Sequence, residues 1–196
     1  MDTVTREAGA QLGVSTRHAR RLAASGVLAG RELAGRRLVS SRSVLAASRS
    51  RGRGRRWTAE TVLAVLELLA SGTTDRVQGS TLSRLRSRLR ASDAQELAYH
   101  VIADRATLWR APRGEGSRAA ELSGTGAAIA VGITSDAVRY ARRERFVQDL
   151  DGQTVLLELD TDATEAAEAI VLYAYGDERT SSAARSRIEA MIAKLA

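Results

Sequence analysis

The first 47 residues alternate between short helical and short extended apolar patterns. Apolar positions spaced four residues apart predict a helix that Gly13 ends, and Ser15 is the expected N-cap of the next helix. Two extended runs then flank Ala34 and Gly35, and short extended runs around a turn that contains glycine predict a hairpin. The expected elements, in order, are helices over 3–12 and 16–25, extended runs over 27–33 and 36–39, and a short helix through Ala47.

Beyond Trp57 the apolar pattern is first helical and then mixed. Thr58 and Thr164 are expected as helix N-caps, and Pro112 precedes a Gly/Ser-rich stretch that reads as a boundary. The expected elements are helices from 58 to 71, from 80 to 90 and from Ser92, a strand over 155–159, and helices over 164–175 and 181–195. Together these patterns predict the α+β class.

Four segments follow from this reading. We expect a helix-turn-helix with a hairpin wing over residues 1–48, an Arg/Gly-rich mobile linker over 49–57, a helical segment over 58–113, and a small acidic α/β domain over 114–196. The last of these is the expected partner-binding domain.

Charge is divided unevenly along the chain. The net charge is +7 overall, but residues 1–56 carry 13 arginines against three acidic residues, which gives +10. Residues 57–113 carry +2, and residues 114–196 carry −5. A strongly basic front indicates a polyanionic partner for that end of the chain.

Composition argues against several other functions. The chain has no cysteine, and its two histidines, His18 and His100, are far apart in sequence, so we expect no metal site, no cofactor and no catalytic centre. Asp160 and Asp162 follow the predicted strand, but acidic residues there also suit a helix N-terminus. No apolar run reaches the length of a membrane span, and Met1 opens no signal-peptide pattern, so the cytoplasm is the expected location.

The exposed side of the second helix and the hairpin provide the candidate DNA contacts. A helix this short fits the major groove, where arginine pairs with a guanine edge, while the wing contacts the backbone or the minor groove. The helix residues are Ser15, Thr16, Arg17, His18, Arg20 and Arg21, and the wing residues are Arg31, Arg36 and Arg37.

The linker is a second basic element. Arg51, Arg53 and Arg55, with Gly52 and Gly54 between them, form two Arg-Gly-Arg units, and Arg56 follows. Such units insert guanidinium groups into a narrow minor groove in some DNA-binding proteins. The alternative is a flexible tether that adds only phosphate attraction and salt dependence.

The N-terminal quarter resembles the MerR and excisionase type of winged helix-turn-helix. The resemblance lies in residues 7–15, Arg20 to Leu22, Ser25 to Leu28, Gly35 to Val39 and Ser43 to Leu45. One departure is Gly9, where such domains usually carry alanine. The resemblance implies double-stranded DNA as partner, with half-sites about 10 bp apart or a multiple of it if the protein binds as a homodimer.

Residues 121–128 and 171–184 are similar to segments of actinobacterial antitoxins of the abortive-infection AbiE type. This resemblance implies a repressor of its own toxin–antitoxin operon that neutralises a nucleotidyltransferase-like toxin. Two alternatives stay open: a MerR-like regulator that senses a small ligand, and an architectural protein that binds DNA without sequence preference.

Overall fold

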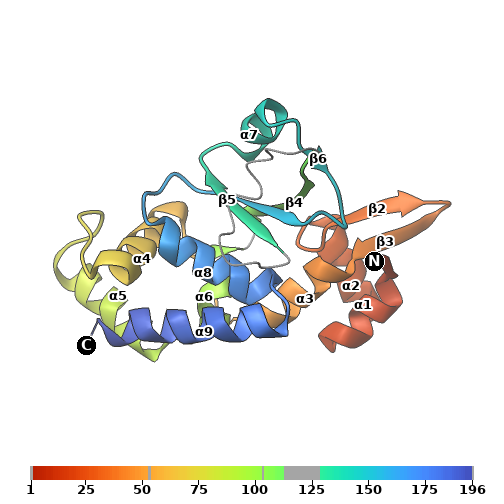
Figure 1. The fold of residues 1–196 in the computed structure, drawn as a ribbon. Coiled ribbons are helices and arrows are strands. Elements are labelled where there is room, and N and C mark those ends of the chain that lie inside the picture. The colour runs from red at the N-terminus through yellow and green to blue at the C-terminus, as the bar shows by residue number, and fades with distance from the viewer. Residues whose placement is uncertain (1, 53, 103, 113–128, 196) are drawn as a thin grey trace.

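A computed structural model of the chain describes residues 2–52, 54–102, 104–112 and 129–195, and within them the fold is mixed α+β (Figure 1). The N-terminal elements are β1 (Asp2–Val4), α1 (Thr5–Leu12), α2 (Thr16–Ala24), β2 (Gly30–Leu33), β3 (Arg36–Ser40) and α3 (Ser41–Arg49). The expected helix over 3–12 begins later than predicted because Asp2–Val4 pair as a strand with β3.

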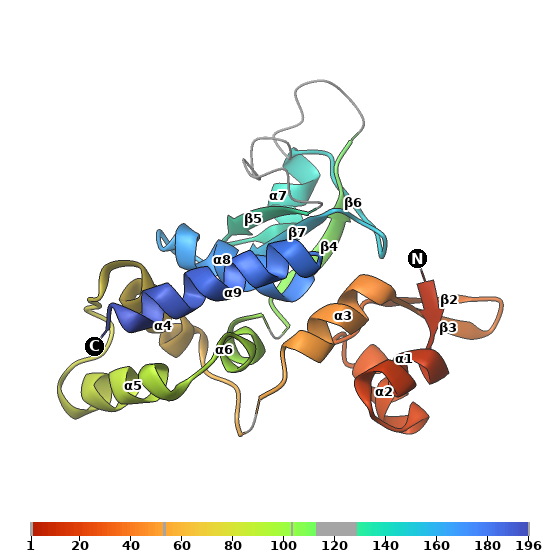
Figure 2. The ribbon, with the colours of Figure 1, turned by 60° about the horizontal axis from the view of Figure 1, so that its bottom comes forward.

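The hairpin β2–β3 projects from the rest of the molecule, at the end opposite α4, α5 and the C-terminus (Figures 1 and 2). It belongs to a three-stranded antiparallel sheet of order β1-β3-β2. Ala34 and Gly35 have φ of 49° and 72°. Two positive φ values in a two-residue loop match the twist of the flanking strands, so the expected hairpin is confirmed and its turn sets the register Glu32 to Arg37.

The turn between α1 and α2 has Gly13 in the left-handed region and brings Gly9 of α1 close to Val14. Gly13 has φ of 64°, and the N–H of Val14 donates to the carbonyl of Gly9 at 2.9 Å. A Cβ on Gly9 would lie 3.0 Å from the Val14 carbonyl oxygen and 3.6 Å from the Ala19 Cβ. The small core of Ala8, Leu12, Leu28, Val39 and Val44 holds the two helices on the sheet.

The remainder of the chain forms a second sheet and six further helices among the described residues. The helices are α4 (Ala59–Ser71), α5 (Gly79–Ala91), α6 (Ala94–Val101), α7 (Ala137–Arg143), α8 (Thr164–Tyr175) and α9 (Glu178–Ala193). The strands are β4 (Ala106–Arg110), β5 (Ala130–Thr134), β6 (Val147–Gln148) and β7 (Thr154–Glu158), in the order β5-β7-β4-β6. Only β5 and β7 are parallel among these described strands.

Both faces of this sheet are covered. Val155 and Leu157 of β7 pack into the large core with α8, whereas Leu156 packs on the other face against Ala141 of α7 and Trp109. A strand buried on both faces reads as a continuous apolar run, which is why β7 was the strand most visible in the sequence.

Helix α8 lies at the centre of the molecule, with α9 alongside it in both views (Figures 1 and 2). It packs against α3, α4, α6, α9 and β5, and nearly all of its residues are buried. One continuous core includes Ala46 of α3, Leu97 of α6 and Ile170 of α8. The small core from Ala8 to Val44 lies wholly within the expected domain 1–48, whereas the buried residues of the large core begin at Ala46 of α3. Strand β4 pairs with β7 across the expected boundary at 113/114.

The segment expected to be a mobile linker makes several contacts. Helix α3 continues to Arg49, whose guanidinium donates to the Gly176 carbonyl at 2.5 Å and pairs with Glu178 at 3.3 Å. Gln95 donates to the Arg51 carbonyl at 3.2 Å, and the Tyr99 hydroxyl donates to the Gly54 carbonyl at 3.1 Å. These bonds hold the segment along α6.

Three predicted helix starts are wrong. The Asp93 side chain caps α6, where Ser92 was expected to begin the helix. Thr164 is the first residue of α8 rather than its cap, and the cap residue Ala163 has no side-chain acceptor. Helix α9 begins at Glu178, three residues before the expected start, because Asp177 accepts from the Thr180 N–H at 2.8 Å.

Candidate nucleic-acid interface

Helix α2 is held with one face inward and the other face exposed. The Ser15 hydroxyl accepts from the His18 N–H at 3.2 Å, so the expected N-cap is confirmed. Ala19 is fully buried against α1, which turns Arg17, Arg20 and Arg21 outward. Ser15 therefore has a structural role as the N-cap of α2, and the exposed arginines are the candidate DNA contacts.

A groove of about 950 Å³ lies between α2 and the hairpin. Its lining residues are Thr16, Arg20, Arg21 and Ala24 of α2, Glu32, Gly35 and Arg37 of the hairpin, and Val4, Thr5 and Arg6 at the start of α1. The structure thus brings together four of the predicted contact residues, from two elements that are separate in sequence. Arg17 is exposed but does not line the groove.

The groove is strongly positive. Four arginine side chains face one carboxylate, that of Glu32. Within the described part of the chain, Arg6, Arg20 and Arg37 take part in no ion pair. Exposed cations that outnumber the acidic groups beside them produce a positive potential that attracts a polyanion such as the phosphate backbone of DNA.

Arg21 differs from the other groove arginines because His18 holds it. Its guanidinium lies 2.9 Å from the His18 Nδ1. A guanidinium only donates, so Nδ1 accepts and the neutral imidazole carries its proton on Nε2. His18 is half-buried and does not line the groove. His18 thus contacts a groove residue, Arg21, from a half-buried position outside the groove.

The predicted wing arginines divide between two faces of the hairpin. Glu32 and Arg37 are cross-strand partners and both line the groove. Arg31 pairs with Leu38, and alternation along the strand places it on the opposite face. Arg36 lies in β3, and its side chain is outside what the structure describes. Of the three, Arg37 is the one that the structure brings to α2.

The linker arginines lie away from the groove. Arg51 donates from Nη2 to the Leu12 carbonyl at 2.9 Å, at the end of α1. Arg56 lies over the Tyr99 ring, with its guanidinium carbon 5.3 Å from the ring centroid. Arg55 is exposed, and Arg53 lies outside the described residues. Arg51 and Arg56 thus contact α1 and α6, which the sequence reading of the linker did not include.

Arg6 is a groove residue that the sequence analysis missed. It lies in the first turn of α1, is exposed, and lines the groove beside Arg20 and Arg37. The signal available in the sequence was its polar position next to the apolar repeat of α1. Only the antiparallel pairing of β1 with β3 brings this helix start beside the hairpin.

We compared the chain with known proteins as well. No protein-family model, curated protein or solved structure matches it. The interpretation of the groove therefore depends on its geometry and charge.

His100, the other histidine, has a structural environment. Its side chain is fully buried, its ring stacks on Trp57 at 4.1 Å, and Nε2 lies 3.1 Å from Arg88 Nη2. Burial, followed by the positive charge of Arg88, holds the pKa of His100 below its usual range. Nδ1 is buried and has no hydrogen-bond partner among the described residues.

Other chemistry has little support in the part of the chain that the structure describes. No group of three or more histidine, cysteine, aspartate or glutamate side chains is placed to hold a metal ion there, Asp160 and Asp162 included. Among the same residues, no helix combines the length and apolar character that crossing a membrane requires.

Proposed function

We propose that this protein is a sequence-specific, double-stranded DNA-binding repressor whose N-terminal part is a winged helix-turn-helix. The observation that carries the proposal is the groove in which Arg20 and Arg21 of α2 and Arg37 of the hairpin face the same space. In this arrangement α2 enters the major groove, with Thr16 and Arg20 toward the base edges, and the hairpin contacts the neighbouring backbone.

Charge supports DNA over a protein partner for this groove. The arginines that line it come from three elements and have one carboxylate among them. A protein interface of this size would be expected to interleave both signs or to include apolar anchors, whereas phosphate contacts require cations alone. Arg17, the exposed residue next to Thr16 on α2, extends the same positive region.

The test is binding to DNA from upstream of the protein's own gene. Fluorescence anisotropy of the full chain on that DNA and on a scrambled duplex, each at two salt concentrations, should show a preference of about 10³-fold or more. Equal affinity for both duplexes, falling steeply with salt, would contradict the proposal and favour an architectural protein.

We further propose an antitoxin role, in which the protein represses its own operon and its C-terminal part binds a nucleotidyltransferase-like toxin. The support is the similarity of residues 121–128 and 171–184 to AbiE-type antitoxins, of which residues 121–128 lie outside the part of the chain that the structure describes. Residues 171–176 lie at the end of α8, where most side chains are buried, so α9 and its exposed acidic and basic residues provide the available surface there. The test is toxicity of a neighbouring nucleotidyltransferase gene with and without this protein. Equal toxicity in both strains would contradict the antitoxin role and leave DNA binding unaffected.

A further inference from the structure

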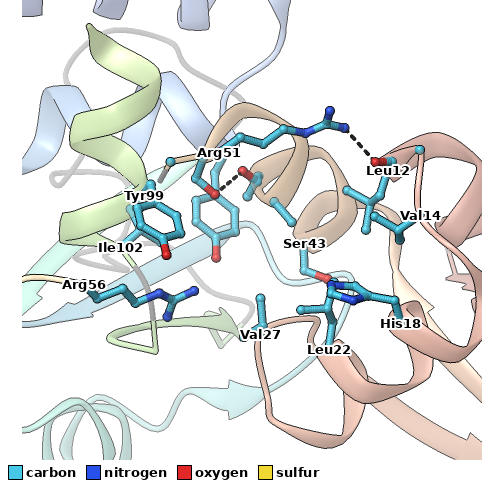
Figure 3. A pocket seen from close by; sticks show the side chains of 16 residues that line it. Leu12, Val14, His18, Leu22, Val27, Ser43, Arg51, Arg56, Tyr99 and Ile102 are labelled. Carbon is cyan, nitrogen blue, oxygen red and sulfur yellow. Dashed lines mark hydrogen bonds between the residues drawn. The ribbon is translucent and has the colours of Figure 1, made fainter. Parts of the chain in front are cut away.

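A pocket of about 370 Å³ lies where the N-terminal module meets the rest of the molecule (Figure 3). One wall comes from the end of α1 and from α2, with Leu12, Val14 and Leu22, and the opposite wall comes from α6 and the end of α8. Helix α3 and the segment after it supply further lining residues, among them Ser43, Ser50 and Arg51. The pocket is thus lined by both the proposed DNA-binding module and the main core.

The walls of the pocket are apolar and aromatic. Leu22 and Val27 face Ile102 and Tyr99 across it (Figure 3). Tyr175, the last residue of α8, also lines the pocket. Ligand pockets commonly have volumes of roughly 300–1,000 Å³, with apolar walls and a few polar groups that orient the ligand. A volume near the lower limit suits a molecule of one or two rings.

The charged side chains that line this pocket are those of Arg51 and Arg56. Arg56 enters from the linker and points across the cavity toward His18 in Figure 3. No carboxylate of the described residues lies within ion-pair distance of Arg56. Arg51 donates one hydrogen bond to the Leu12 carbonyl. No acidic residue lines the pocket. A cation beside apolar walls fits an anionic, partly apolar ligand.

We propose that this pocket binds a small aromatic carboxylate, with the carboxylate on Arg56 and the ring between Leu22 and Tyr99, and that binding weakens the affinity for DNA. The effect of the ligand on DNA affinity rests on the proposed function, whereas the binding of the carboxylate in the pocket is independent of it. The junction between two lobes is a common position for such sites because both lobes contribute lining.

The coupling runs through His18. Its Nδ1 accepts from Arg21 of the groove, and the ring itself lines the pocket. A ligand carboxylate that accepts from Nε2–H makes Nδ1 a stronger acceptor, because hydrogen bonds in a chain polarise one another. Arg21 is then held more firmly on His18 and is withheld from the DNA phosphates.

The ligand site is tested without DNA. Calorimetry of the full chain should show 2-naphthoate binding at one site, with 2-naphthalenemethanol, its neutral counterpart, at least about tenfold weaker. Arg56→Gln should weaken naphthoate binding at least about tenfold. Arg55→Gln is the matched control, because it removes the same charge from the adjacent, exposed position and should leave naphthoate binding unchanged.

Three results would overturn the ligand site: no binding of naphthoate, equal binding of the acid and the alcohol, or equal loss in the Arg55 and Arg56 variants. Thermal unfolding followed by circular dichroism checks that both variants are folded. Because Arg56 is only half-buried, both are expected to unfold at the parent temperature.

The coupling is tested by anisotropy on upstream DNA with and without saturating naphthoate. The affinity should fall by at least about fivefold, and DNA should weaken naphthoate binding by the same factor, because coupling between two sites is reciprocal. His18→Gln should bind naphthoate and DNA with less coupling. An unchanged DNA affinity overturns the coupling. A chain that binds no DNA overturns the proposed function and the coupling together, while calorimetry still decides the ligand site.

Discussion

Single side chains divide clearly between structural and candidate functional roles. Ser15 caps α2, His100 stacks in the core, and Arg49 ties α3 to the end of α8. Arg20 and Arg37, in contrast, have no ion-pair partner in the described structure and line the same groove. At this scale, an exposed cation without an internal partner is the observation that distinguishes a contact residue from a structural one.

Arg20→Ala should weaken binding to the specific DNA by about 1–3 kcal/mol, roughly 5- to 150-fold, if Arg20 reads a base. Arg84→Ala is the matched control, since Arg84 is an exposed arginine on α5, far from the groove in sequence and fold. Anisotropy on specific and scrambled duplexes measures both. An equal loss of DNA affinity in the Arg20 and Arg84 variants would contradict the proposal that the groove binds DNA. A loss of the same size on both duplexes would make Arg20 a phosphate contact.

His100 should make the stability of the protein depend on pH. Its folded pKa lies below the unfolded value of about 6.5, so the unfolded chain binds the proton more readily. The contribution is therefore fully present above about pH 6.5 and is lost as the pH falls toward the lower folded pKa. His100→Phe, which keeps a ring on Trp57, should remove this part of the pH dependence. Urea unfolding between about pH 8 and pH 5 measures the free energy of unfolding at each pH. The same pH dependence in the parent and the variant would contradict this role of His100.

At the scale of elements, hydroxyl caps determine where several helices start and how they are anchored. Ser15 caps α2 at the surface, whereas Ser40 caps α3 while fully buried. The Ser40 hydroxyl accepts from the Ser43 N–H at 3.4 Å and donates to the Leu150 carbonyl at 2.6 Å. Ser40 thus joins the base of the hairpin to the β6–β7 connection.

Ser40→Ala should cost about 2–3 kcal/mol of the free energy of unfolding, because it removes a cap and leaves the Leu150 carbonyl without its donor. Ser15→Ala, which removes an exposed cap alone, should cost about 1 kcal/mol. Urea denaturation of the two variants against the parent measures the difference. Equal costs would show that the bond from Ser40 to Leu150 contributes nothing to stability.

At the scale of the molecule, one core joins segments that the sequence separated. Ala46, Leu97, Val155 and Ile170 belong to the same buried cluster, and α8 contacts helices from both sides of Pro112. The pocket behind α2 exists only because of this joining, since its walls come from α1, α2, α6 and α8.

The shared core predicts a single cooperative unfolding transition. Far-ultraviolet circular dichroism reports mainly the helices, and fluorescence reports Trp57 and Trp109, which are buried in different clusters. Both probes should give the same urea midpoint, since neither of these two clusters can be exposed without disrupting the sheet that lies between them. Separate midpoints would indicate independently folding domains.

Local signals in the sequence were sufficient for much of the N-terminal part. Gly13 and Gly35 act through glycine's tolerance of positive φ, and Ser15 acts through its side-chain cap, so two helices and a hairpin were predictable without knowledge of their neighbours. The positive charge of residues 1–56 could likewise be counted from the sequence without knowledge of the fold. Strand β7 was visible because both of its faces are buried.

Only the tertiary structure decided which of these residues lie together. Strands β1, β4 and β6 are short and take their pairing from distant partners, so their own sequences indicate little. The same long-range pairing brings Arg6 to the groove, places Arg31 on the other face of the hairpin, and sets Arg56 against Tyr99. The amino-acid sequence by itself determined the local turns, caps and charge, whereas register and packing between distant segments determined the groove and the pocket.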